Sequence, residues 1–214
     1  MKKILVAASV LVAAFSLRAS LDGYFMLAGC SQGQLPSPAY TIYGGRLSMI
    51  YGDCHEFYGL DVGIAGTVQE SAYGLSVNAV WSGVDADMYG AQVGGLMNTV
   101  KGSVFGLQSG VYNWSGELFG CQIGLINLSD DCYGTQIGVY NGSYNLYGTQ
   151  IGYWNMADDS YGCQCGVVNV ANDVYGCQIG VFNYARKLYG CQIGWADVQT
   201  ACMLPVLPIL HLGW

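Results

Sequence analysis

Charged side chains are scarce in this chain, and basic ones are the scarcest. The 214 residues include 7 Lys and Arg against 14 Asp and Glu, and charged residues make up 10% of the chain, whereas a soluble protein usually carries about 25%. Beyond residue 19 the basic residues are Arg46, Lys101, Arg186 and Lys187. No basic patch is formed by this spacing, so the sequence gives no support to nucleic-acid binding.

Histidine is also scarce, and this limits the catalytic and metal sites that the chain can build. His55 and His211 are the two histidines, and they lie far apart in the sequence. His55 belongs to a polar cluster at residues 53–56, which is more typical of a solvated turn than of a cation site. The same interpretation applies to the acidic pairs at 130–131 and 158–159. We therefore expect no catalytic residue, no cofactor and no metal, and we predict that the protein is not an enzyme.

The apolar runs are too short for a membrane-spanning helix. The longest, at residues 4–17, covers about 14 residues, and a span needs about 20. It follows Lys2 and Lys3 and precedes a possible cleavage site at 17–19, which is typical of a secretory signal. We predict a signal peptide at 1–19, a lead-in segment at 20–42 and a single repeat-built β domain at 43–214. Cys30 ends a lipoprotein-like box, but it lies away from the apolar run, which disfavours lipidation.

Repetition is what this chain has in abundance. An aromatic–glycine pair recurs every 14 residues, with a Gln three residues after the aromatic and an Asn five residues after the Gln. The aromatic residues are Phe105, Phe119, Tyr133, Tyr147, Tyr161, Tyr175 and Tyr189, with looser copies beginning at Tyr43, Tyr58, Tyr73 and Tyr89. The polar rows are Gln122, Gln136, Gln150, Gln164, Gln178 and Gln192, and Asn127, Asn141, Asn155, Asn169 and Asn183. Self-similarity at a fixed period dictates the architecture.

Each repeat predicts β structure. Aromatic and β-branched residues without a 3.6-residue stripe favour strands, and polar turn residues occur once per period. One turn per repeat leaves about ten residues for a strand, which would span about 33 Å and cross the roughly 25 Å apolar band of an outer membrane. In the repeat at 175–188, Cys177 and Ile179 would face lipid, and Gln178 would face the lumen. We therefore predict an all-β, antiparallel meander of about 12 strands closed as an outer-membrane β-barrel, with the terminal Trp214 as a membrane-assembly signal.

A β-solenoid with 14-residue coils is the alternative. Each coil would contain two short strands and two turns, and like residues would stack on like. The Gln and Asn rows would then form amide ladders on one face, and this face would be the binding surface. In the barrel the Gln row would instead line the lumen.

The cysteines bear on the same choice. Cys121, Cys163, Cys177 and Cys191 share a repeat position with Thr135 and Thr149, which favours structural packing in a small slot. Disulfides are the alternative in an exported chain, since such chains meet an oxidising compartment. The candidates for disulfides are Cys163, Cys165, Cys177 and Cys191. A parallel solenoid would stack Cys163, Cys177 and Cys191 about 4.8 Å apart.

The segment Tyr-Gly-Cys-Gln-Ile-Gly-Val-Phe-Asn-Tyr-Ala at 175–185 resembles the G-x-Q-x-G-x-x-N-x-A unit of the bacterial surface-repeat proteins of leptospires. The resemblance continues at 34–38 and 43–63, and it closes at 204–214 with two prolines and a terminal aromatic. The cysteines and Ala196-Asp197 depart from that pattern. The resemblance implies a cell-surface or outer-membrane location, and it brings no activity, ligand or catalytic residue.

These observations predict a non-catalytic structural or interaction protein of the bacterial outer membrane or cell surface. Membrane lipid is the expected partner, and a protein or glycan partner stays open. A small outer-membrane pore or transporter is one alternative. A soluble β-solenoid that acts as an adhesin or ligand-binding module is the other.

Overall fold

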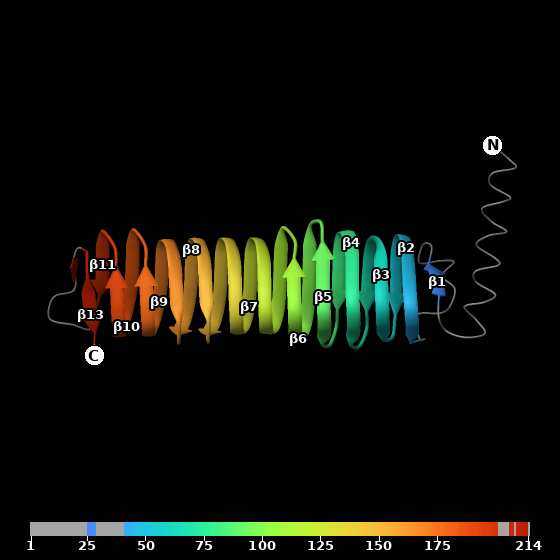
Figure 1. Ribbon diagram of the computed structural model, residues 1–214, viewed down its shortest axis with the longest axis horizontal. Coiled ribbons are helices and arrows are strands. Elements are labelled where there is room, and N and C mark those ends of the chain that lie inside the picture. The colour runs from blue at the N-terminus through green and yellow to red at the C-terminus, as the bar shows by residue number, and fades with distance from the viewer. Residues whose placement is uncertain (1–24, 29–40, 201–205, 208, 214) are drawn as a thin grey trace, which may run out of the picture. The chain divides into compact units, whose positions relative to one another are not determined.

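Consecutive repeats pair side by side and run in the same direction, so that each repeat is one coil of a parallel β-solenoid. The computed structural model describes residues 25–28, 41–200, 206–207 and 209–213 (Figure 1). The chain divides into a first unit, Met1–Gly102, and a second unit, Ser103–Trp214, and the described residues form about 11 coils. The predicted signal peptide, most of the lead-in segment, Cys30 and Trp214 lie outside the described residues.

The first unit begins with β1 (Phe25–Ala28) and β2 (Ile42–Cys54), followed by β3 (Phe57–Val68), β4 (Ala72–Val84) and β5 (Met88–Gly94). β6 (Met97–Ser109) starts in this unit and continues into the second. Each strand pairs in parallel with the next, and β4 pairs with both β5 and β6. The pairing places Tyr43 beside Tyr58, Tyr58 beside Tyr73 and Tyr73 beside Tyr89.

The second unit has the strict 14-residue register. β7 (Tyr112–Leu146) extends over more than two repeats. It is followed by β8 (Thr149–Ser160), β9 (Cys163–Ile179), β10 (Phe182–Ile193) and β11 (Ala196–Gln199), and each of these strands pairs in parallel with the one before it. Two short strands then reverse direction. β12 (Val206–Leu207) pairs antiparallel with β11, and β13 (His211–Gly213) pairs antiparallel with β10. Covering exposed edges in this way protects a solenoid from end-to-end pairing.

The predicted antiparallel barrel of about 12 strands is therefore wrong, because the strands are parallel. The barrel prediction rests on one turn per repeat, whereas a coil of the solenoid has two. In the second unit some repeats bend at the aromatic–glycine pair, as at 147–148 and 161–162, and others at a glycine followed by an apolar residue, as at Gly180-Val181 and Gly194-Trp195. The second kind of bend has no polar turn residue to mark it. The prediction of one strand of about ten residues per repeat is therefore wrong, because each coil contains two shorter strands.

The interior of each coil is narrow and half polar. In the repeat at 175–188, Gln178, Asn183, Ala185 and Leu188 point inward and are buried. The same four positions are buried in neighbouring repeats, so amides occupy half of the core positions. Most of the apolar side chains consequently lie on the outside, which accounts for the high apolar content of a chain with few charges.

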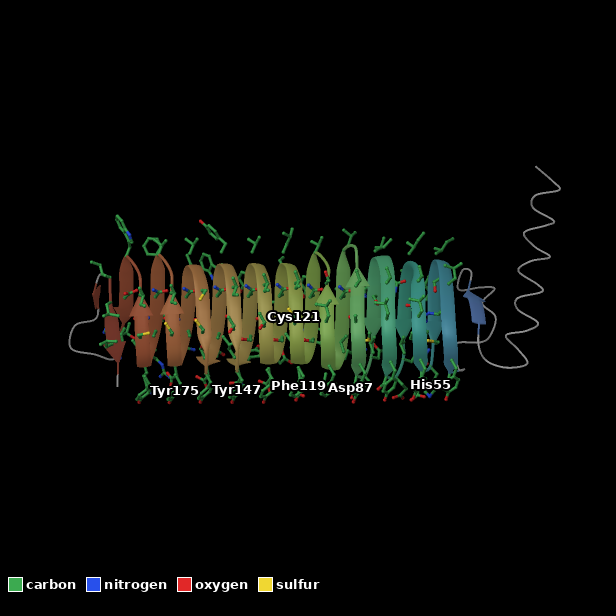
Figure 2. The ribbon with its side chains drawn as sticks, viewed as in Figure 1. His55, Asp87, Phe119, Cys121, Tyr147 and Tyr175 are labelled. Atoms are coloured by element: carbon green, nitrogen blue, oxygen red, sulfur yellow. The ribbon has the colours of Figure 1, made fainter. Side chains whose placement is uncertain are left out.

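A stack of aromatic rings runs along one edge of the second unit. Successive rings from Phe105 to Tyr189 lie 4.8–5.0 Å apart and within 7° of parallel, and Figure 2 shows Phe119, Tyr147 and Tyr175 along this edge. The glycine after each ring permits the close approach. Gly176 has a φ of +154°, and a Cβ there would lie 2.0 Å from the carbonyl oxygen of Gly162, a position that only glycine occupies without strain.

Candidate functional site

The glutamine row forms a continuous hydrogen-bonded ladder inside the second unit. Each Nε2 donates to the Oε1 of the glutamine one repeat earlier, at 2.7–2.9 Å from Gln122 to Gln192. A further hydrogen bond runs across the coil to a backbone carbonyl, as from Gln136 to Gly142 at 3.3 Å. The glutamines are fully buried. Their amide groups are thus committed to the fold.

The asparagine row forms a second ladder that runs in the opposite direction. Asn127 Nδ2 donates to Asn141 Oδ1 at 2.8 Å, which is one repeat later, and also to the carbonyl of Ile137 at 2.9 Å. The row ends at Asp197, which accepts from Asn183 Nδ2 at 2.7 Å. A carboxylate only accepts hydrogen bonds, so it ends a row of donors without leaving an amide hydrogen unpaired. This explains why Asp197 departs from the repeat.

Both ladders lie inside, and neither is available as the binding face that the solenoid alternative assigned to them. The interior positions of the described coils are filled by packed, hydrogen-bonded side chains, so the lumen that a pore requires is missing from this part of the chain. A binding surface has to be sought on the outer faces.

The first unit has a buried ion pair at the repeat position that glutamine occupies in the second unit. Arg46 donates from Nε and Nη2 to the two carboxylate oxygens of Asp61, both at 2.8 Å, and both side chains are 1% exposed. Ser76 and Asn78 donate to Asp61 Oδ2 at 3.0 and 2.9 Å. Arg46 also contacts Cys54 Sγ at 3.1 Å. Counting three residues on from Tyr43, Tyr58 and Tyr73 would have found this pair in the sequence.

The reactivity of this cluster is low. Burial raises the pKa of the Cys54 thiol to about 12, although the Arg46 guanidinium opposes the rise. The thiol is therefore protonated at neutral pH, and the carboxylate is satisfied by three donors. This arrangement suits a structural ion pair in the first unit better than a nucleophile.

The polar cluster at 53–56 and the two histidines do not come together as one site. Asp53 accepts from Gln69 Nε2 at 2.8 Å, and His55 lies in the bend between β2 and β3. His211 is buried in β13, where it pairs with Gln192. Across the described residues, no group of three or more His, Cys, Asp or Glu side chains is placed to hold a metal ion.

Four cysteines gather on one outer face of the second unit. Cys177 and Cys191 are register partners with their sulfur atoms 3.1 Å apart, and Cys163 lies 3.4 Å from Cys165. The described cysteines are all free thiols, so disulfides among these four stay a prediction. The pKa is raised to about 12 at Cys177 and to about 11 at Cys163. Burial is the larger cause in both, and the hydrogen bond with a neighbouring thiol is the second.

The second strand of each repeat carries an outward row of large apolar side chains, which we call the aromatic face. The register aligns Tyr140 with Trp154, Trp154 with Val168 and Val168 with Phe182. Two residues further along each strand lies a second row on the same face. The aromatic face comprises Tyr112, Trp114, Ile126, Leu128, Tyr140, Trp154, Met156, Val168, Val170, Phe182 and Tyr184. Phe182 is 55% exposed and Trp154 41% exposed, so this face is open to solvent.

A hollow of about 330 Å³ interrupts the aromatic face at Gly142. Gly142 is register partner to Met156, and where its neighbours carry large side chains it carries none. The hollow is walled by Leu128 and Met156 along the row and by Tyr140 and Tyr144 across it. The Tyr140 hydroxyl donates to Met156 Sδ at 3.6 Å. Asp130 and Asp158 line the rim.

Comparison with protein-family models, with curated proteins and with solved structures found no match. The resemblance to leptospiral surface repeats therefore stays a prediction. Within the described residues, no helix has the length and hydropathy of a membrane span. The candidate site thus rests on the geometry of the second unit.

Proposed function

We propose that this protein is a soluble, non-catalytic β-solenoid adhesin or ligand-binding module, and that the aromatic face of the second unit is its binding surface. The partition of polar and apolar residues carries the proposal. Amides that are ordinarily exposed are buried here, whereas Trp154 and Phe182 are open to solvent. Exposed apolar patches of this kind mark interaction surfaces.

The chemistry of the face also supports binding rather than catalysis. Its side chains are aromatic and aliphatic, and these offer area and shape but neither a nucleophile nor a base. Aromatic residues are enriched at interfaces because they bury much surface with few rotatable bonds. The thiols of the neighbouring face have raised pKa values at Cys163 and Cys177, which disfavours their use as nucleophiles at neutral pH. A location at the cell surface, which the repeat resemblance implies, belongs to the proposal.

The first test is purification of the full chain without detergent, followed by retention assays on cellulose, chitin and collagen. These three polymers represent the glycan and protein partners that the sequence leaves open. The test variant is Trp154→Ser with Phe182→Ser, which removes two exposed rings from the aromatic face. The matched control is Ile137→Ser with Ile179→Ser, which removes two similarly exposed apolar residues from the other strand of the repeats.

We expect the wild-type chain to stay in solution without detergent and to be retained on at least one polymer. Retention should fall in the ring-deleted variant and persist in the isoleucine variant. The proposal is wrong if the chain requires detergent, if none of the polymers retains it, or if both variants are retained equally.

A further inference from the structure

We propose that the hollow at Gly142 binds a trimethylammonium group, as found in choline and related organic cations. This inference rests on the proposed function, because it assigns a ligand class to one part of the aromatic face.

Shape comes from alternation along one strand. Tyr140, Gly142 and Tyr144 are two residues apart and point outward, while Asn141 is buried and the Ser143 hydroxyl accepts from Gln150 Nε2 at 3.2 Å inside the coil. The two tyrosines therefore stand on either side of a position without a side chain. A Cβ added to Gly142 would lie 2.8 Å from Leu128 Cδ2. A larger residue at position 142 would therefore displace Leu128 from the wall of the hollow.

Charge is of one sign around this hollow. Asp130 and Asp158 occupy the same repeat position as Tyr144, one repeat before and one repeat after it, and both line the hollow. No basic residue lines it. Of the basic residues on either side in the sequence, Lys101 is paired with Asp85, and Arg186 and Lys187 are paired with Asp173. Two carboxylates beside aromatic rings favour a cation and disfavour an anion.

Hydrogen-bonding capacity selects the kind of cation. A primary ammonium has three N–H donors to satisfy. The hydroxyls of Ser129 and Ser143 also line the hollow, but they accept from Gln136 and Gln150 inside the coil, which leaves the two carboxylates and the tyrosine hydroxyls as acceptors for a ligand. Asp158 already accepts one hydrogen bond from Asn172, at 3.2 Å. A trimethylammonium group needs no acceptor. Its methyl groups pack against the apolar walls, its charge lies over the rings, and the carboxylates supply long-range attraction.

The test is calorimetric titration of the full chain with choline and with 3,3-dimethyl-1-butanol, a neutral compound of the same shape. We expect choline to bind at least ~10-fold more tightly than the neutral compound, because cation–π and carboxylate attraction act on it alone. Binding should weaken as salt is added. Equal affinity for the two compounds, or no saturable binding of choline, would overturn the inference.

Variants locate the binding in the hollow. Gly142→Leu, which copies the neighbouring Leu128, fills the space and should weaken choline binding at least ~10-fold, since the ligand loses its contact with the rings. Asp130→Asn keeps the shape and removes one charge, and it should weaken binding about 5-fold. The matched control is Asp159→Asn, which removes one charge next to Asp158 from a side chain that does not line the hollow, and it should change binding less than about 2-fold.

Folding does not confound this design. Circular dichroism and the melting temperature report whether Gly142→Leu is folded, and the exposed Asp130→Asn tests the charge without touching the core. Wild-type affinity in both Asp130→Asn and a folded Gly142→Leu would exclude the hollow. Failure of the two proposals can be told apart. If choline does not bind but ring deletion abolishes polymer retention, this inference alone is wrong. If choline binds in the hollow but ring deletion leaves retention intact, the proposed function alone is wrong.

Discussion

Replacing Gln150 by Leu tests whether the polar interior stabilises the solenoid. Gln150 Nε2 donates to Gln136 Oε1 at 2.8 Å, and Gln150 Oε1 accepts from Gln164 Nε2 at 2.8 Å. Leucine has a similar volume but leaves an acceptor on Gln136 and a donor on Gln164 buried without this partner. Each orphaned buried group costs about 1–3 kcal/mol, so the free energy of unfolding should fall by roughly 2–6 kcal/mol.

The assay is urea unfolding followed by circular dichroism, with hydrogen exchange to resolve local opening. Hydrogen exchange is needed because repeat proteins lose structure unit by unit, so that one global transition is not assured. The matched control is Ile151→Ala, the next residue on the same strand, whose side chain is 44% exposed. This surface change should alter stability by less than about 1 kcal/mol.

The result that would refute the reasoning is an unchanged or raised midpoint for Gln150→Leu. Apolar replacement of paired polar groups is sometimes neutral when both partners are removed together. Here only one member of a continuous row is removed, and its two neighbours lose their partner. A neutral outcome would mean that the ladder follows from the register of the strands and contributes nothing to stability.

Three further predictions follow from single positions. Gly176→Ala places a Cβ 2.0 Å from the Gly162 carbonyl oxygen at a φ of +154° and should destabilise the second unit by more than about 1 kcal/mol, measured as a lower midpoint in urea. Asp61→Ala leaves the Arg46 guanidinium buried without its carboxylate and should cost about 3–5 kcal/mol, whereas a loss below 1 kcal/mol in thermal unfolding would contradict a structural ion pair. Because the raised pKa of Cys177, about 12, keeps the thiol protonated, alkylation by iodoacetamide should be slow at pH 7 and accelerate steadily up to pH 11; a rate that levels off near pH 8 would contradict it.

The repeat and its period could be predicted from the sequence, because the aromatic–glycine pairs and the Gln and Asn rows recur at fixed spacing. The direction of successive strands could not. Alternation places Gln178 inside and Ile179 outside in a barrel and in a solenoid alike, so side-chain periodicity does not separate the two. What separates them is the second bend, at Gly180-Val181, where an apolar residue occupies a turn and gives no polar signal.

The candidate site was harder to predict from the sequence than the fold. The hollow depends on which side chains of three successive repeats lie beside one another, and this follows only once the strands are known to be parallel and 14 residues apart. Gly142 reads in the sequence as an ordinary departure at a variable repeat position. Along the row of residues that share its repeat position, Gly142 stands between Leu128 and Met156, and the tyrosines two residues away on either side complete the walls.

In this solenoid the amides are buried and most large apolar side chains are exposed. The residues that hold the fold are therefore different from those that remain free for function. Amide ladders, small residues and, in most coils, one aliphatic residue fill the interior of the second unit, and these leave no interior position for Trp154 or Phe182. Burial of rings therefore does not stabilise the coil, because the rings stand outside it. Large apolar side chains kept in water raise the tendency to associate without strengthening the core. The same periodicity exposes a row of isoleucines on the other strand of the repeats, at 123, 137, 151, 179 and 193, so the proposal that a ligand covers the aromatic face depends on the comparison of the ring-deleted variant with the isoleucine variant.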